Sequence, residues 1–207
     1  MRSIQTLLVA AGLMFSSFSS NGQYVQAERD DTIRLYASTP FDSTVAIRAL
    51  ARGNSSIKGV AFTKPKTKFG YKAPLSKRIY ANKIKIMLFP VTPYLLEYLE
   101  LRKKENPKKL KFVYINPAAS YYRYEAITNS VGEFTFPNLK PGRYYLEGIL
   151  PWSQTSSYNQ YTGSGYNGYG GVTDYYDRKY YNVAHYDKIA EFVEIQSEGQ
   201  TVNIKLR

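Results

Sequence analysis

Cysteine is absent from the 207 residues, and histidine occurs once, as His185. Without cysteine the chain has no disulfide, no thiol nucleophile and no cysteine that could carry a lipid. A single histidine excludes metal sites built from several histidines, and it leaves a serine–histidine–aspartate triad only if His185 itself serves it. Since a lone histidine among tyrosines is typical of surface or packing positions, we predict a protein that is not an enzyme and needs no metal or cofactor.

A calcium-binding loop is missing too. Asp174 and Asp177, with Asp187 further on, lack the D-x-[DN]-x-[DN]-G spacing that such a loop requires. We therefore interpret these acids as solvated.

The N-terminal apolar run, residues 7–15, is only nine residues long, which is too short to span a bilayer. Arg2 precedes it and a serine-rich stretch follows, the order typical of a secretory signal peptide. We predict that residues 1–27 form this signal, with cleavage after Gly22 or Ala27. The mature protein should then be secreted or periplasmic, with no transmembrane segment.

A pattern of strands and turns is present at residues 128–148. Phe134 and Phe136 alternate with Glu133 and Thr135, as a strand with one buried face requires. The alternation predicts a strand at the centre of a small sandwich.

A tight turn should follow at Pro141-Gly142, because proline fixes φ and glycine tolerates positive φ. Tyr144, just past this turn, stands where a tyrosine hydroxyl can tie a Greek-key corner back to the backbone.

The run T-x-x-x-G-x-F-x-F-x-x-L-x-P-G-x-Y-x-L at residues 128–146 resembles that of carboxypeptidase regulatory-like domains. Residues 56–62, 83–92 and 199–206 are similar to the opening, second and closing strands of that family. The resemblance implies an all-β fold, a Greek-key, transthyretin-like (prealbumin-like) antiparallel β-sandwich of about seven strands. It also implies an extracytoplasmic habit, but no particular activity, because the family ranges from accessory domains to adhesin modules.

Lys58, Asn203 and Glu147 are similar to the set that forms internal isopeptide bonds in related pilin and adhesin sandwiches. Glu147 stands one place out of step, which would turn it to the opposite face of its sheet. The bond would lower the intact mass by about 17 Da, the mass of the ammonia released.

We expect an N-terminal extension over residues 28–54 and the sandwich over residues 55–207, with insertions at about 93–109 and 154–186. The extension should hold a short helix that begins at Thr39-Pro40 and ends near Gly53.

The first insertion should hold a helix over residues 94–105. Thr92 can cap its N-terminus, and Pro93 suits the first helical position. Further strands are expected at residues 83–88, 110–115, 121–128, 190–195 and 201–206.

Positive charge is concentrated between Lys58 and Lys111, which hold 15 Lys or Arg against 3 Glu. This segment carries the whole net charge of +12, which favours an anionic partner. Solvation of surface insertions explains such a run equally well. The candidate residues lie around the end of the inserted helix: Arg102, Lys103, Lys104, Lys108 and Lys109.

The second insertion, residues 154–186, holds nine tyrosines and five glycines. We predict a loop with a flexible backbone whose rings stack on a ligand, since tyrosine gives a large contact area at low entropic cost. A low-complexity surface loop without a ligand is the alternative. The candidate stacking residues are Tyr166, Tyr169, Tyr175 and Tyr176.

These features together predict a non-enzymatic binding or structural module of the cell envelope. The first hypothesis is contact between the basic insertion and an anionic envelope polymer, with peripheral membrane contact possible and nucleic acid the weaker candidate. The alternatives are a carbohydrate- or protein-binding module that uses the tyrosine-rich segment, and an accessory domain of an envelope or surface complex.

Overall fold

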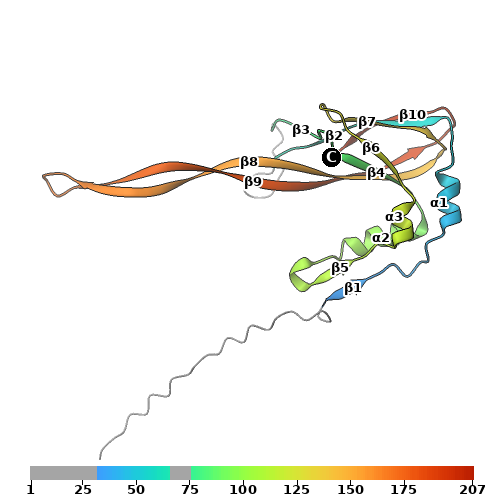
Figure 1. The fold of residues 1–207 in the computed structure, drawn as a ribbon, viewed down its shortest axis with the longest axis horizontal. Coiled ribbons are helices and arrows are strands. Elements are labelled where there is room, and N and C mark those ends of the chain that lie inside the picture. Colours follow the sequence, from blue (N-terminus) through green and yellow to red (C-terminus); the bar gives the residue numbers. More distant parts are fainter. Residues whose placement is uncertain (1–31, 66–75) are drawn as a thin grey trace, which may run out of the picture.

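The computed structural model describes residues 32–65 and 76–207, and it is an all-β sandwich with a few short helices (Figure 1). Two sheets pack face to face, and a long two-stranded ribbon extends from one of them. The predicted fold class is confirmed.

The smaller sheet is built around β2 (Ser55–Thr63). On one side β10 (Thr201–Leu206) runs parallel to β2. On the other side β2 pairs antiparallel with two strands in succession along its length. Its first part pairs with β7 (Glu133–Leu139) and its last two residues pair with β3 (Ile79–Tyr80). The expected opening and closing strands are therefore neighbours in the fold.

The larger sheet is antiparallel throughout, in the order β6-β4-β8-β9. Its strands are β6 (Tyr124–Ile127), β4 (Lys85–Pro90), β8 (Gly142–Tyr166) and β9 (Val172–Ile195).

The core lies between the two sheets. Phe134 and Phe136 point into it with only 4% and 3% of their surfaces exposed, so the predicted alternation is confirmed. They meet Ile57 from β2 and Leu88 and Leu146 from the larger sheet, all fully buried. Each such side chain contributes about 1.5–3 kcal/mol of apolar burial.

The corner after β7 has the predicted form. The Tyr144 hydroxyl lies 2.8 Å from the carbonyl oxygen of Lys140 and 3.1 Å from that of Ala49. It therefore ties the Pro141-Gly142 turn to the N-terminal extension.

The N-terminal helix is shorter than expected. α1 spans Ser43–Ala49, because the Asp42 carboxylate caps it by accepting from the N–H groups of Thr44 (2.8 Å) and Val45 (3.4 Å). The expected cap, Thr39, instead donates its backbone N–H to Glu97.

Gly53 lies beyond the end of α1 and has a packing role instead. A Cβ at this position would lie 2.3 Å from the carbonyl oxygen of Leu139, which leaves no room for a side chain. The sequence predicted the end of the helix near Gly53, but the structure shows that this position requires glycine because of close packing.

The inserted helix begins where expected. α2 spans Pro93–Arg102, and the Thr92 hydroxyl accepts from the N–H of Leu95 at 3.2 Å. α2 ends three residues before the predicted boundary. Its buried Tyr94, Leu95 and Tyr98 cover the outer face of the larger sheet at Tyr145.

The expected strand at residues 110–115 does not join the sandwich. β5 (Lys111–Val113) instead pairs in parallel with β1 (Ile33–Leu35), forming a separate two-stranded sheet. A short 3-10 helix, η2 (Pro107–Lys109), precedes β5, and Leu110 between them takes a left-handed φ of 50° that turns the chain aside.

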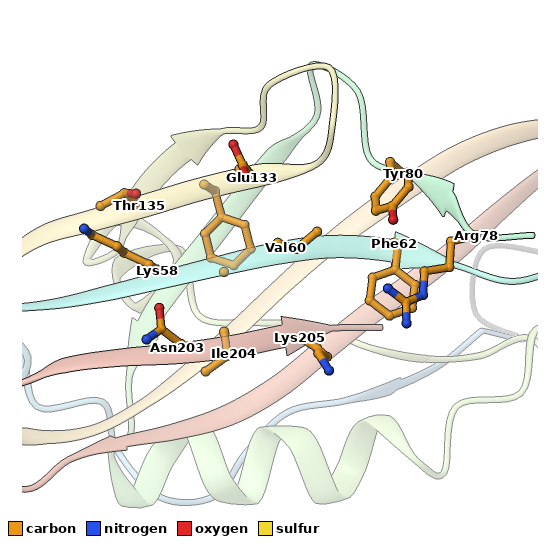
Figure 2. Close-up of a pocket in the computed structure, with 12 residues that line it drawn as sticks. Lys58, Val60, Phe62, Arg78, Tyr80, Glu133, Thr135, Asn203, Ile204 and Lys205 are labelled. Atoms are coloured by element: carbon orange, nitrogen blue, oxygen red, sulfur yellow. The ribbon is translucent and has the colours of Figure 1, made fainter.

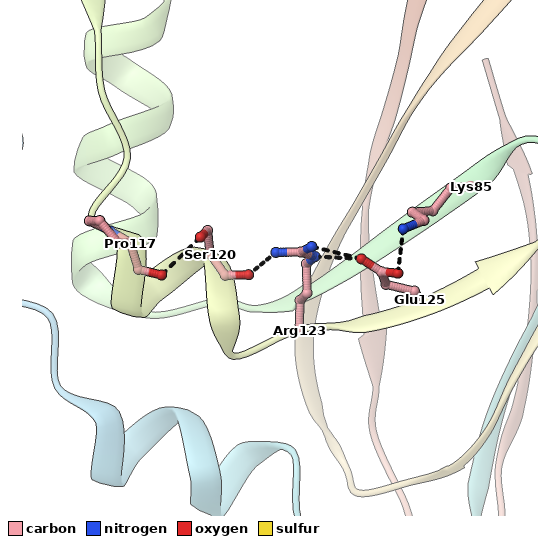
Figure 3. A network of polar contacts seen from close by, with 5 residues as sticks. All are labelled: Lys85, Pro117, Ser120, Arg123 and Glu125. Atoms are coloured by element: carbon pink, nitrogen blue, oxygen red, sulfur yellow. Dashed lines mark hydrogen bonds and ion pairs between the residues drawn. The ribbon is translucent and has the colours of Figure 1, made fainter.

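A further helix, α3 (Pro117–Tyr121), precedes β6 and overlaps the segment expected as a strand only at Tyr121. Polar contacts join α3 to the larger sheet (Figure 3). The Ser120 hydroxyl donates to the carbonyl of Pro117, and Arg123 donates to the carbonyl of Ser120. Glu125 pairs with Lys85 and Arg123, each at 2.7 Å, and hydrogen bonds from Lys85 and then Arg123 lower the pKa of this carboxyl.

The tyrosine-rich segment is not a loop. β8 and β9 continue well beyond the sandwich as one ribbon, paired as far as Tyr166 and Val172, with a bulge after Tyr161 (Figure 1). The Asn167 side chain closes the turn by accepting from the N–H groups of Tyr169 (3.1 Å) and Gly171 (2.7 Å). We call residues 151–187 the arm. Its tyrosines and threonines suit extended backbone, and pairing satisfies the polar groups that a loop would leave to water.

Candidate binding surfaces

Three surfaces carry the side chains of interest: the arm, the basic segment around the end of α2, and a groove on the outer face of the smaller sheet. None of the helices described in residues 32–65 and 76–207 combines the length and apolar character needed to cross a membrane. Within the same ranges, no group of three or more acidic or histidine side chains is arranged to hold a metal ion.

The arm presents tyrosines on both of its faces, because side chains alternate along a strand and register partners share a face. One face continues the outer face of the larger sheet and carries Tyr161, Tyr166, Tyr176, Tyr180 and Tyr186. The opposite face carries Tyr158, Tyr175 and Tyr181, and Tyr169 lies in the turn.

The four predicted stacking residues therefore do not form one surface. Tyr166 and Tyr176 share a face, Tyr175 lies on the other, and Tyr169 is fully exposed at the tip. All nine tyrosines of the arm are accessible, with exposed fractions from 49% to 101%.

Neighbouring rings hold one another in place. Tyr161 and Tyr176 are direct register partners and meet edge to face at 5.7 Å between ring centroids. On the opposite face, Tyr158 and Tyr181 lie 6.1 Å apart. Such pairs stabilise a ribbon by about 0.2–1 kcal/mol each.

His185 lies at the base of the arm, stacked on the indole ring of Trp152 at 4.2 Å between centroids. Trp152 in turn packs against the sandwich core. The nearby Asp187 accepts a hydrogen bond from the Thr63 hydroxyl at 2.6 Å, which joins the arm to β2. These contacts anchor the arm.

The basic segment contains one cation that is already neutralised. Arg102 lies 2.8 Å from the Glu147 carboxylate, which is 13% exposed, and Lys188 approaches the same oxygen at 3.2 Å. The Tyr145 hydroxyl also donates to it at 3.2 Å. Burial, and then the charge of Glu147, raise the pKa of Tyr145, so this hydroxyl keeps its proton.

Lys103 pairs with Glu100 at 2.5 Å on the exposed side of α2. Lys104, Lys108 and Lys109 are exposed and form no ion pair with any described residue. Of the five predicted basic residues, three therefore keep an unpaired charge.

The groove lies across β10, β2, β7 and β3, has a volume of about 800 Å³, and is open to solvent (Figure 2). Its cations are Lys58, Arg78 and Lys205, none of them ion-paired within the described part of the chain. Arg78 lies over the ring of Phe62, 4.7 Å from its centroid. Tyr80 completes this aromatic corner, with its ring 6.2 Å from that of Phe62.

Sequence reasoning missed the groove. Val60 and Phe62 stand at outward positions of β2, where polar side chains are usual, and this was the available signal. Phe62 is nevertheless buried, because Tyr80 of β3 and Arg78 just before this strand pack against its ring.

The isopeptide arrangement does not form. Lys58 and Asn203 are register partners on β2 and β10, at the outer face of the smaller sheet. Glu147 belongs to the other sheet and pairs with Arg102, which agrees with the expectation that it faces the opposite way.

A search against models of known protein families finds no match, and a search of curated proteins finds none either. Among solved structures, the chain is similar to the crystal structure of a proposed carbohydrate binding protein from Pseudomonas aeruginosa. The TM-score is 0.53 and the sequence identity 17%, covering 81% of this chain and 97% of that one. At this identity the likeness shows a shared fold alone, and membership of the carboxypeptidase regulatory-like family stays a prediction.

Proposed function

We propose that this protein is a non-enzymatic binding module that recognises carbohydrate through the exposed tyrosines of the arm, outside the cytoplasm. The observation that carries the proposal is the array of nine accessible tyrosines on an ordered ribbon. The likeness to a proposed carbohydrate binding protein supports the same ligand class. The signal-like N-terminus supports the location.

The physical argument rests on preorganisation. A tyrosine ring offers a large flat surface at low entropic cost, and rings already held by cross-strand contacts lose little freedom when a ligand binds. Alternate residues on one strand lie roughly 6.6 Å apart, so the rings of one face form a ladder rather than a closed pocket. Such a ladder suits an extended polymer better than a single sugar.

The two faces of the arm provide the test. The double variant Tyr176→Ala/Tyr180→Ala removes rings from one face, and Tyr175→Ala/Tyr181→Ala removes rings from the other. Binding to a panel of neutral and acidic polysaccharides should weaken at least tenfold for one pair and change little for the other. Binding should also persist from low to physiological salt, because stacking does not depend on screened charge. Equal, undiminished binding by both variants would overturn the proposal.

A second candidate is an anionic polymer held by the unpaired cations. Lys58, Arg78 and Lys205 line one groove with only one carboxylate, Glu133, which accepts a hydrogen bond from Asn129. Affinity for lipopolysaccharide, acidic glycans or anionic vesicles would then fall steeply with salt. Charge reversal at Lys58 and Lys205 should abolish binding through the groove. The same change at Lys104, Lys108 and Lys109 tests the basic segment separately.

A further inference from the structure

The two edges of the arm differ in charge. β4 pairs with β8 only as far as Gly148, so beyond that point one edge of β8 has no neighbouring strand in the described chain. No charged residue occurs from Gly148 to Thr173. The partner strand β9 carries six charges in its part of the arm and at its base, three acidic and three basic: Asp174, Asp177, Arg178, Lys179, Asp187 and Lys188.

Such an edge is unusual. An unpaired strand edge is a template for pairing with another strand, and soluble proteins protect it with charges, prolines, bulges or short length. Along β8 these devices are Pro151 at the base and the bulge after Tyr161 near the tip. The residues between them, mostly serine, threonine, glutamine and tyrosine, leave the edge unprotected.

We propose that this free edge of β8 pairs antiparallel with the same edge of a second copy of the chain. The two arms would then form one four-stranded sheet in the order β9-β8-β8-β9. The interface is isologous, since the same strand contributes from both copies.

The choice of a second copy as partner follows from the charges. In an isologous pairing a strand meets its own residues, so like charges on it would repel one another. β8 has none over the whole exposed length, and its Ser, Thr, Gln and Tyr side chains can pair with their own kind.

The antiparallel direction follows from the charge of the rest of the molecule. The arm carries a net charge of −1, from three aspartates against Arg178 and Lys179, so the rest of the chain holds a net +13. Antiparallel arms place the two positive bodies at opposite ends of a ribbon about 50 Å long, given about 3.3 Å per residue. That separation far exceeds the screening length of about 8 Å at physiological ionic strength. Parallel pairing would instead bring the two positive bodies together.

The first test is the mass of the protein in solution, measured by sedimentation over a wide concentration range. The natural sequence should form a dimer. Ser153→Lys/Thr155→Lys places two charges on each β8 edge and should weaken the dimer at least tenfold. The matched control is Ala184→Lys/Asn182→Lys, which places the same charges at the register partners on β9 and breaks the same Thr155–Asn182 hydrogen bond. The control should remain dimeric.

A second test uses the absence of native cysteine. Single substitutions Ser153→Cys, Thr155→Cys, Ser157→Cys and Asn159→Cys sample one face of β8. In an antiparallel pairing only the position nearest the two-fold axis meets its own copy, so disulfide-linked dimer should peak at one position. Arg178→Cys, Tyr180→Cys, Asn182→Cys and Ala184→Cys on β9 should give little dimer. Monomers at every concentration, equal effects of the two lysine pairs, or dimer yield spread evenly over all positions would each overturn the proposal.

Discussion

The sandwich and the arm are made from the same two strands, yet different forces hold them. Up to Leu150, alternate residues of β8 are buried against the smaller sheet, and in β9 burial begins at Ile189. Beyond these points no residue of either strand is buried, and the ribbon relies on its ladder and cross-strand pairs. An isolated two-stranded ribbon is marginally stable at best, so the arm depends on its anchor at the base.

The largest expected effect separates the two regions directly. Phe136→Ala opens a cavity in the core and should lower the free energy of unfolding by about 3–5 kcal/mol. Tyr176→Ala, a comparably large truncation on the arm, should cost less than about 1 kcal/mol, because it loses mainly one ring contact. Urea unfolding of both variants measures the contrast. Similar losses would mean that the arm folds as part of the core.

The corner tyrosine should give the next largest effect. Tyr144→Phe keeps the buried ring but removes the hydroxyl that donates to Lys140 and approaches Ala49. Loss of this buried hydrogen bond should cost about 1–3 kcal/mol. Tyr121→Phe is the control, since its ring is largely exposed, and it should leave the unfolding midpoint unchanged.

Alanine variants of Arg102 and Lys104 test whether two cations that lie two residues apart contribute differently to stability. Arg102→Ala leaves the half-enclosed Glu147 with Lys188 as its remaining cation and should cost about 1–2 kcal/mol, less than for a fully buried pair. Lys104→Ala should leave stability unchanged within about 0.5 kcal/mol. Thermal unfolding distinguishes the two, and equal effects would contradict a structural role for Arg102.

The smallest expected effect is a change in how folding stability depends on pH in acid. Hydrogen bonds from Thr39, its side chain first, and from Ser38 lower the pKa of Glu97 from 4.5 to about 2. A carboxyl whose pKa is lower in the folded state stabilises the fold above its unfolded pKa. This contribution should therefore fade as pH falls from about 4.5 towards 2. Glu97→Gln should flatten that part of the stability–pH curve, and a curve that remains as steep would show that other carboxyls dominate.

Much of the sandwich was predictable because its signals are local. The alternation at Phe134 and Phe136 identified a strand, Pro141-Gly142 a turn, and Tyr144 a corner contact. The cap at Thr92 identified the start of α2 in the same way. Each of these depends on residues within a few positions of one another.

The sequence-based predictions were wrong where a segment distant in the chain supplies the hydrogen-bond partner. Thr39 could cap a helix, but Glu97, 58 positions away, takes its N–H. The segment at residues 110–115 has a strand pattern, but its partner proved to be β1 rather than the sandwich.

The candidate sites were less predictable than the fold. Composition pointed to the tyrosines and lysines as candidates, but it could not show which of the tyrosines share a face of the arm. The groove depends on Lys58, Arg78 and Lys205, which come from three strands or their approaches. No spacing along the chain brings these residues together.

The sequence alone thus determined the all-β class, the central strand-turn-strand motif and the location of the positive charge. Alternation, turn chemistry and net charge are properties of short segments and need no partner. Only the tertiary structure decided that residues 154–186 form a paired arm and that Arg102 is neutralised by Glu147. Both outcomes depend on which backbone and side-chain groups meet across space, because a polar group takes the partner that folding brings within reach.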